Sequence, residues 1–315
     1  SIESLNIKPR LISGAFLFKS IKMNYYQPTT IIYHNGEFVK AQDAKMDLYS
    51  QSLHYGYSVF EGIRSYKTTK GSTAIFKAVE HFERLKISAE SINLPYSFNT
   101  QELIDATYEV LKQNNLGDAY IRPVVYAPAN MSFARNTESY VFIEAWEMAP
   151  FLGDQLLRIM TSSFQRPNPK AFKIHAKAAG HYVNSILASQ EAKDKGFDEA
   201  FLLDMNDHAA EGPGANVFFE KGGVLHTPQA GHILAGITRA TVLELCAQLN
   251  IEVKEGVFSI NDIKQADAAF FCGTAAEVIG WQSLDEYVFP KAWNETNSYK
   301  VQQAYKQLVV KPLSA

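Results

Sequence analysis

The chain has 315 residues, of which 46% are hydrophobic and 20% are charged, as is ordinary for a folded globular protein. Its length favours two domains over one core, and its net charge of -3 gives no reason to expect nucleic acid or an anionic membrane as a partner. No apolar run approaches the roughly 20 residues that span a bilayer. Cys246 and Cys272 lie far apart without metal-ligand spacing, which favours buried, reduced thiols in a cytoplasmic protein.

The first half of the chain is predicted to mix strands and helices. Asn35 and Gly36 stand between two β-prone arms, a pattern that predicts a hairpin over residues 31–39. Pro123 lies inside a strand-like run and predicts an edge strand or an irregularity there. Thr100 is the expected N-cap of a second helix. Further strands are expected over residues 73–77, 120–126 and 140–145, and the first helix over residues 79–92.

The second half begins after a turn-like linker at residues 150–155. Helices are expected at residues 236–249 and 298–308, and strands at 156–161, 199–203, 216–220, 224–227, 251–257 and 268–272. Strands and helices that mix without strict βαβ alternation predict α+β or mixed α/β domains. We therefore expect an N-terminal extension over residues 1–29, a small α/β domain over 30–150 and a larger cofactor-binding domain over 151–315.

Residues 176–192 place one lysine among small residues, just ahead of a helical run. Alanine and glycine around Lys177 would let a bulky group approach the backbone closely, and Tyr182 brings a phenol nearby. A lysine that loses its solvation in such a setting loses proton affinity and becomes an amine nucleophile. Taken alone, the segment is better explained by a surface lysine at the start of a helix, since most lysines are solvated.

Two glycine-marked turns are candidates for phosphate binding. Gly236 stands just before a helix, so that free N–H groups of Ile237 and Thr238 could face an anion. Gly273 and Thr274 follow a strand and offer backbone N–H groups and a hydroxyl. Neither turn matches the P-loop pattern, and residues 211–216 are not a dinucleotide fingerprint, so nucleotide binding is not indicated.

Other polar residues have structural explanations when each is taken alone. Arg84 lies on a helix, where a solvated face is the default. An isolated Glu211 among small residues would be costly to bury unless it were paired. Tyr120 and Arg122, two apart on a strand, point to the same face. The histidines have no convincing zinc spacing, and we expect no metal site.

Taken together, these segments resemble the branched-chain amino-acid aminotransferases, which are fold-type IV enzymes that use pyridoxal phosphate. The resemblance covers residues 30–312, in other words nearly everything except the N-terminal extension. Six motifs carry it in family order: residues 53–64 (LHYGYSVFEGIR), 120–123 (YIRP), 176–182 (AKAAGHY), 211–216 (EGPGAN), 234–239 (LAGITR) and 273–277 (GTAAE). It implies a two-domain fold with the cofactor at the domain interface.

The resemblance also implies roles for single residues. Lys177 would bind the cofactor covalently and carry a proton, Glu211 would face its ring nitrogen, and Tyr182 its ring oxygen. The phosphate would be held by Arg84, Thr274 and the N–H groups of Ile237 and Thr238.

For the substrate, the resemblance places the α-carboxylate near Tyr120 and the N–H groups of Thr274 and Ala275. Arg122 would meet the distal carboxylate of glutamate. Phe60 and Tyr55 would line the side-chain pocket, with Tyr55 reaching across from a second subunit of a homodimer. The implied reaction is transamination of leucine, isoleucine and valine with 2-oxoglutarate.

The sequence departs from the family pattern at several positions near the implied pocket. Ala179 and His181 stand where the family often has glycine and asparagine, and Met148 and Phe151 replace a tryptophan and a tyrosine. Two alternatives of the same fold are a D-amino-acid aminotransferase and an aminodeoxychorismate lyase. A third possibility is a non-catalytic binding protein that keeps the fold.

Overall fold

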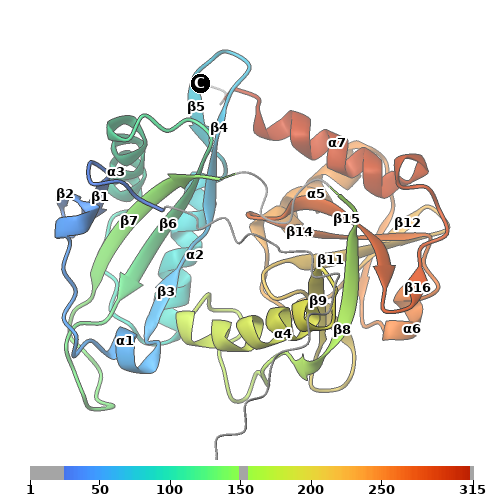
Figure 1. Ribbon diagram of the computed structural model, residues 1–315, viewed down its shortest axis with the longest axis horizontal. Helices are drawn as coiled ribbons and strands as arrows, with labels where there is room; N and C mark the ends of the chain where they lie inside the picture. The colour runs from blue at the N-terminus through green and yellow to red at the C-terminus, as the bar shows by residue number, and fades with distance from the viewer. Residues whose placement is uncertain (1–24, 149–154, 313–315) are drawn as a thin grey trace, which may run out of the picture.

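The computed structural model describes residues 25–148 and 155–312. Its strands form two sheets that stand side by side in Figure 1, the first built before residue 148 and the second after residue 155. The boundary expected between residues 150 and 151 lies outside the described residues, as does most of the N-terminal extension expected over residues 1–29.

The first sheet is antiparallel, with strand order β2-β1-β7-β6-β4-β5, and β3 also pairs with β6. The predicted hairpin is confirmed: Asn35 and Gly36 have φ angles of 50° and 93° and form its turn. The strands are β1 (Ile31–His34), β2 (Glu37–Lys40), β3 (Ser58–Phe60), β4 (Ile63–Lys67), β5 (Thr73–Ile75), β6 (Ala119–Tyr126) and β7 (Tyr140–Glu147).

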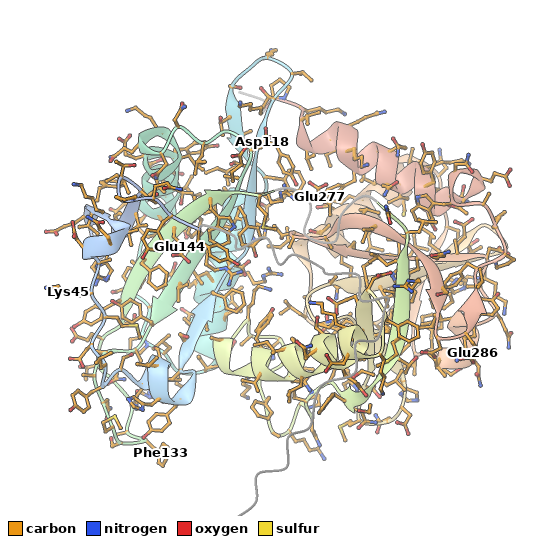
Figure 2. All side chains as sticks on the ribbon, in the orientation of Figure 1. Lys45, Asp118, Phe133, Glu144, Glu277 and Glu286 are labelled. Carbon is orange, nitrogen blue, oxygen red and sulfur yellow. The ribbon has the colours of Figure 1, made fainter. Side chains whose placement is uncertain are left out.

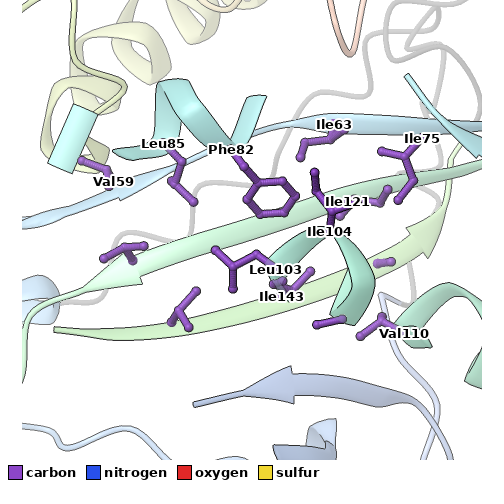
Figure 3. Packing of buried hydrophobic residues seen from close by; sticks show 14 of the residues in the cluster. Val59, Ile63, Ile75, Phe82, Leu85, Leu103, Ile104, Val110, Ile121 and Ile143 are labelled. Atoms are coloured by element: carbon purple, nitrogen blue, oxygen red, sulfur yellow. The ribbon is translucent and has the colours of Figure 1, made fainter. Parts of the chain in front are cut away.

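Helices α2 (Ala78–Ser91) and α3 (Thr100–Gln113) cover one face of this sheet. Figure 3 shows the core between them, in which Phe82 and Leu85 of α2 and Ile121 of β6 are fully buried. Alternate residues of β6 point to the opposite face, so Tyr120 and Arg122 lie away from this core. The packing of one face thus leaves the other face free to carry polar side chains.

The predicted cap of α3 was wrong by one residue. Asn99 is the N-cap, and its side chain accepts hydrogen bonds from the N–H groups of Gln101 and Glu102. Asparagine is at least as good an N-cap as threonine. Thr100 is the first helical residue, and its hydroxyl donates instead to Glu83 (2.6 Å).

Pro123 does not mark an edge strand, which corrects the first of the two options predicted for it. β6 lies inside the sheet, with β7 on one side and both β3 and β4 on the other. The irregularity lies in the neighbouring strands: β4 pairs as far as Ile121, and β3 takes over at Val124. The residue without an N–H therefore stands at a break in the ladder, where a donor is not required.

The second sheet has strand order β10-β9-β8-β15-β14-β11-β12-β13, with β16 on β15. β10 pairs with both β9 and β11, so the sheet curls back on itself. Its strands are β8 (Leu157–Gln165), β9 (Glu199–Leu203), β10 (Ala209–Glu211), β11 (Asn216–Lys221), β12 (Val224–Pro228), β13 (Val253–Gly256), β14 (Ala268–Gly273), β15 (Glu277–Leu284) and β16 (Tyr287–Val288).

The helices of the second half are α4 (Tyr182–Asp194), α5 (Ile237–Gln248), the short α6 (Ile260–Ile263) and α7 (Asn297–Val309), while the short α1 (Gln51–Tyr55) belongs to the first half. α5 and α7 pack over β14 and bury Val242 and Tyr305. Cys246 and Cys272 lie in the same core as free thiols, as expected, and burial raises the pKa of the Cys246 thiol to about 12. None of the helices over residues 25–148 and 155–312 is long and apolar enough to cross a membrane.

The two halves are joined by direct backbone contacts beside Lys177. The Phe60 N–H donates to the Lys177 carbonyl (3.1 Å), and the Gly180 N–H donates to the Gly56 carbonyl (3.1 Å). Gly56 has a φ of 65°, and a Cβ on it would lie 2.7 Å from the Cα of Gly180. The segment that carries the lysine is therefore fixed against the first sheet.

Candidate active site

Lys177 and Tyr182 meet across a short turn. The Lys177 N–H donates to Ser88 Oγ of α2 (3.0 Å), and residues 179–181 form a 3-10 turn that leads into α4. Tyr182, the first residue of α4, then places its hydroxyl 2.7 Å from Lys177 Nζ. The amine also lies 5.2 Å from the centre of the Phe60 ring. An amine that is half-buried and hydrogen-bonded to a phenol is a good position for a nucleophile.

The amine opens into a pocket that encloses about 590 Å³ of space, part of it open to solvent. The pocket brings together all seven residues that were expected to bind the cofactor: Arg84 of α2, Lys177, Tyr182 of α4, Glu211 of β10, Ile237 and Thr238 of α5, and Thr274, which follows β14.

A buried carboxylate forms one wall of the pocket. Glu211 accepts hydrogen bonds from Asn216 Nδ2 (3.0 Å) and the Leu234 N–H (3.2 Å), and Arg166 Nε lies 2.8 Å from its Oε1. Burial raises the pKa of Glu211, and Arg166 opposes that shift. The carboxylate is held in one place and is suited to a cationic or N–H donor group from the pocket side.

The first turn of α5 forms another wall. Gly236 is its N-cap and has no side chain to accept hydrogen bonds from the first N–H groups. A Cβ on Gly236 would lie 2.0 Å from Asn216 Oδ1, so only glycine fits here without displacing Asn216. Ile237 and Thr238 line the pocket at this point. A helix N-terminus with free N–H groups is an anion site, and Arg84 and Thr274 line the same pocket.

Arg84 is held by a buried carboxylate that the sequence analysis missed. Its Nε and Nη2 donate to the two oxygens of Glu61 (2.7 and 2.8 Å), and its Nη1 donates to the Ala235 carbonyl (2.9 Å). Glu61 is fully buried and also contacts His81 Nδ1 (2.8 Å). Burial would raise the pKa of Glu61, but Arg84 and His81 together lower it to about 2. Arg84 thus has one fixed orientation.

The residues expected to contact substrate form a second group beside the amine. The Phe60 ring lies 4.4 Å from Arg122 Cζ and 4.7 Å from the ring of Tyr182. Arg122 Nη2 donates to the Tyr120 hydroxyl (3.0 Å). A Cβ at position 62 would lie 2.0 Å from that hydroxyl, so Gly62 makes room for Tyr120. Phe60 therefore connects this group to the lysine.

Thr274 and Ala275 lie in the turn between β14 and β15, but only Thr274 lines the pocket with the lysine. Glu277 ends this turn in the left-handed region with φ of 55°. Its carboxylate accepts from the Tyr66 hydroxyl (2.8 Å) and lies 3.5 Å from Arg64 Nη1. Figure 2 shows Glu277 between the two halves, where this contact ties the turn to β4.

Tyr55 does not line the pocket of its own chain. Its side chain is 44% exposed, its hydroxyl donates to the Met131 carbonyl (3.2 Å), and its ring lies 5.3 Å from that of Phe133. Among the other positions that depart from the family pattern, His181 lines the pocket, and its ring packs edge-on against Phe172 with the ring centres 5.1 Å apart. Met148 is buried. Phe151 lies outside the described residues.

Comparison with known proteins identifies the family. The sequence pattern of the amino-transferase class IV family matches residues 58–284, more than half of the chain. The chain belongs to the class IV aminotransferases. The branched-chain-amino-acid aminotransferase of Pseudomonas aeruginosa is 39% identical to this class IV aminotransferase over 285 residues, which cover 89% of this chain and 92% of that protein.

Solved structures agree with this assignment. The crystal structure of a branched-chain aminotransferase from Thermoproteus uzoniensis, determined with norvaline, superimposes with a TM-score of 0.86 at 34% identity and covers 89% of this chain and 95% of that one. A T.th. branched-chain aminotransferase complexed with N-(5'-phosphopyridoxyl)-L-glutamate has a TM-score of 0.83 at 36% identity over 90% of this chain and 94% of that one. The same T.th. enzyme was also solved with 4-methylvaleric acid. The predicted family and mixed α/β fold of this class IV aminotransferase are confirmed.

Proposed function

We propose that this class IV aminotransferase is a pyridoxal-phosphate-dependent branched-chain amino-acid transaminase. It transfers the amino group of L-leucine, L-isoleucine or L-valine to 2-oxoglutarate, which gives branched-chain 2-oxo acids and L-glutamate. The observation that carries this proposal is the Lys177 amine, 2.7 Å from the Tyr182 hydroxyl, in a pocket that also holds Glu211 and the N-terminus of α5. The similarity to proteins named branched-chain aminotransferases supports the choice of substrate.

The donors and acceptors of the pocket fit pyridoxal phosphate. Glu211 suits a protonated ring nitrogen, Tyr182 can donate to the ring oxygen, and Lys177 supplies the amine for the aldehyde. The anion site suits the phosphate, with Arg84, Thr274 and the N–H groups of Ile237 and Thr238 as its donors. When bound, the cofactor supplies an electron sink that makes the substrate Cα–H acidic.

The residues of the chain then supply positioning and proton transfer. With the cofactor bound, the freed Lys177 amine would take the proton from the substrate Cα and carry it, acting first as general base and then as general acid. Tyr182 orients the amine through its 2.7 Å hydrogen bond. Glu211 keeps a proton on the ring nitrogen, and Arg166 and Asn216 hold the carboxylate in place.

We assign the substrate contacts to the group around Phe60. The α-carboxylate meets Tyr120 and the N–H groups of Thr274 and Ala275, and a distal carboxylate meets Arg122. An aliphatic side chain lies against Phe60 and stops short of Arg122. One pocket can in this way take both glutamate and a branched-chain amino acid.

We further propose a cytoplasmic homodimer in which Tyr55 completes the pocket of the partner. The side chain of Tyr55 is exposed and does not line the pocket of its own chain. Val183, Ile186 and Leu187 of α4 and Leu53 of α1 are between 46% and 66% exposed, and a second copy would cover such an apolar surface. Small molecules are the proposed partners, with no nucleic acid and no membrane. We keep residues 30–150 and 151–315 as the proposed domains.

An absorbance spectrum of the purified protein with pyridoxal phosphate tests the activity. L-leucine should convert the visible band of the lysine-bound cofactor to the near-ultraviolet band of the amine form, and 2-oxoglutarate should restore it. A band that responds to D-alanine and not to L-leucine would assign the protein to the D-amino-acid aminotransferases. A protein that takes up no cofactor would contradict the proposal altogether.

A further inference from the structure

Glu144 lies directly opposite Arg122 on the first sheet. The two residues are register partners on the antiparallel strands β7 and β6, so their side chains leave the same face of the sheet. The next pair on that face is Trp146 and Tyr120, whose rings lie 5.1 Å apart. Figure 2 shows Glu144 over the first sheet. A carboxylate thus stands beside the arginine to which we assign the distal carboxylate of the substrate.

The guanidinium of Arg122 contacts the side chains of Phe60 and Tyr120. It packs on the Phe60 ring at 4.4 Å, and its Nη2 donates to the Tyr120 hydroxyl. Its Nε is buried and has no hydrogen-bond partner within residues 25–148 and 155–312. The arginine is therefore held beside Phe60 and keeps a donor that no described residue uses.

The charges of Glu144 and Arg122 act on each other. Glu144 is partly buried, and burial raises the pKa of its carboxyl, while the charge of Arg122 opposes that rise. The negative charge of an ionised Glu144 offsets part of the positive charge of Arg122. Burial strengthens this interaction, because the dielectric constant is lower there than in water.

We propose that Glu144 is a specificity-determining residue, which serves as the counter-charge of Arg122 when the pocket holds an aliphatic side chain. This inference rests on the proposed function. A bound leucine side chain removes water from Arg122 without offering it a negative charge, and Glu144 reduces the cost of that desolvation. A bound glutamate brings a second carboxylate to the same arginine, and Glu144 repels it. Glu144 therefore shifts the preference of the pocket from acidic towards aliphatic side chains.

The test compares two substrate-like acids that differ at the distal end. Glutarate and 4-methylvalerate are titrated into the cofactor-loaded protein by calorimetry, for the wild type, Glu144→Gln, Glu144→Asp and Glu147→Gln. Glu147 is an exposed carboxylate on the same strand and serves as the matched control. We expect Glu144→Gln to bind glutarate about three- to tenfold more tightly and 4-methylvalerate more weakly. Glu144→Asp should shift the affinities for glutarate and 4-methylvalerate in the same directions but by less. Glu147→Gln should bind both acids as the wild type does.

Steady-state kinetics give a second readout. In Glu144→Gln the KM for 2-oxoglutarate should fall and that for L-leucine should rise, while kcat changes little. An unchanged ratio of the two affinities, or equal changes in both, would overturn the inference. If Glu144→Gln does not fold, an unchanged ratio in Glu144→Asp would overturn it instead. Failure of the proposed function is recognised separately, because the wild type would then not turn over L-leucine.

Discussion

At the scale of single residues, the position of Lys177 makes the strongest prediction. Lys177→Ala should lower kcat by at least about a thousandfold, because the amine 2.7 Å from the Tyr182 hydroxyl is lost. The anion site is untouched, so the variant should still bind pyridoxal phosphate, but without the visible band of a lysine-bound cofactor. Turnover and absorbance of the purified variant provide the measurement.

Lys173→Ala is the matched control, since Lys173 is an exposed lysine four residues before Lys177. It should keep the turnover and the spectrum of the wild type. Full activity in Lys177→Ala would refute the assignment of the amine.

The pair of Glu61 and Arg84 predicts a cost in stability. Glu61→Gln should lower the free energy of unfolding by about 3–5 kcal/mol at neutral pH, because Arg84 and His81 lose a buried partner. It should also weaken cofactor binding, since Glu61 fixes the direction of Arg84. Urea unfolding and titration with pyridoxal phosphate measure the two effects. Glu90→Gln removes an exposed carboxylate on α2, the helix that carries Arg84, and should change the free energy of unfolding by less than about 0.5 kcal/mol.

The pKa of Glu61 gives this effect a pH dependence. Its value in the folded protein is about 2, below the ordinary value of 4.5. A carboxyl with a lowered pKa contributes stability that is fully present above its unfolded value and is lost as the pH falls towards the folded value. The difference between wild type and Glu61→Gln should therefore be constant near neutral pH and shrink below about pH 4.5. A difference that grows on acidification would contradict the assignment.

The site residues that could be predicted from the sequence are those within recognisable motifs. Lys177, Glu211 and Arg84 fall in or near such segments, and the structure places them in one pocket. Arg166 was missed because it lies 45 positions before its partner Glu211 and has no local pattern around it. Glu61 and Asn216 lie inside two of the quoted motifs, yet only the folded chain shows which carboxylate and which donor they meet.

At the scale of secondary structure, the contact between α1 and the turn before α4 is the most sensitive. Gly56→Ala combines a φ of 65° with a Cβ that would lie 2.7 Å from the Gly180 Cα, and backbone cannot move aside easily. We expect this substitution to lower the free energy of unfolding by about 2–5 kcal/mol, which is the sum of the cost of a positive φ and the cost of overpacking. kcat should also fall, because the turn sets the distance between Lys177 and Tyr182.

Gly71→Ala separates the two causes. Gly71 has a similar positive φ of 83° but nothing within 4 Å of its Cβ position. Gly71→Ala should therefore lower the free energy of unfolding by only about 1–2 kcal/mol and leave kcat unchanged. Equal losses of stability and activity in both variants, by thermal unfolding and turnover, would show that the contact with Gly180 is unimportant.

Elements with a clear local pattern were predicted well. The hairpin at Asn35, the strand over residues 199–203 and the helix that follows Gly236 were confirmed. β3 and β4 were missed because glycines and polar residues interrupt their apolar pattern, and their pairing with β6 depends on residues about 60 positions away. For Pro123 the sequence left an edge strand and an irregularity both open, because the break opposite it lies in another part of the chain.

At the scale of the whole molecule, the placement of Tyr55 predicts complementation between subunits. Lys177→Ala and Tyr55→Ala should each form homodimers with poor activity. After denaturation and refolding together, mixed dimers should contain one site with both native residues, and activity should return to about a quarter of the wild-type value. Mixing followed by a turnover assay tests this, with each variant refolded alone as its control. No recovery in mixed dimers would mean that Tyr55 acts within its own chain.

The parallel pairing of β8 with β15 also matters while the chain is being made. β8 ends at Gln165 and its neighbour begins only at Glu277, so one edge of β8 has no partner until the later strand is synthesised. At about 5–20 residues per second, that delay is on the order of ten seconds on the ribosome. An unpaired strand edge is a site for wrong pairing with other chains. A nascent chain stalled between these two strands should therefore depend on chaperones and should bind no cofactor until β15 has joined the sheet.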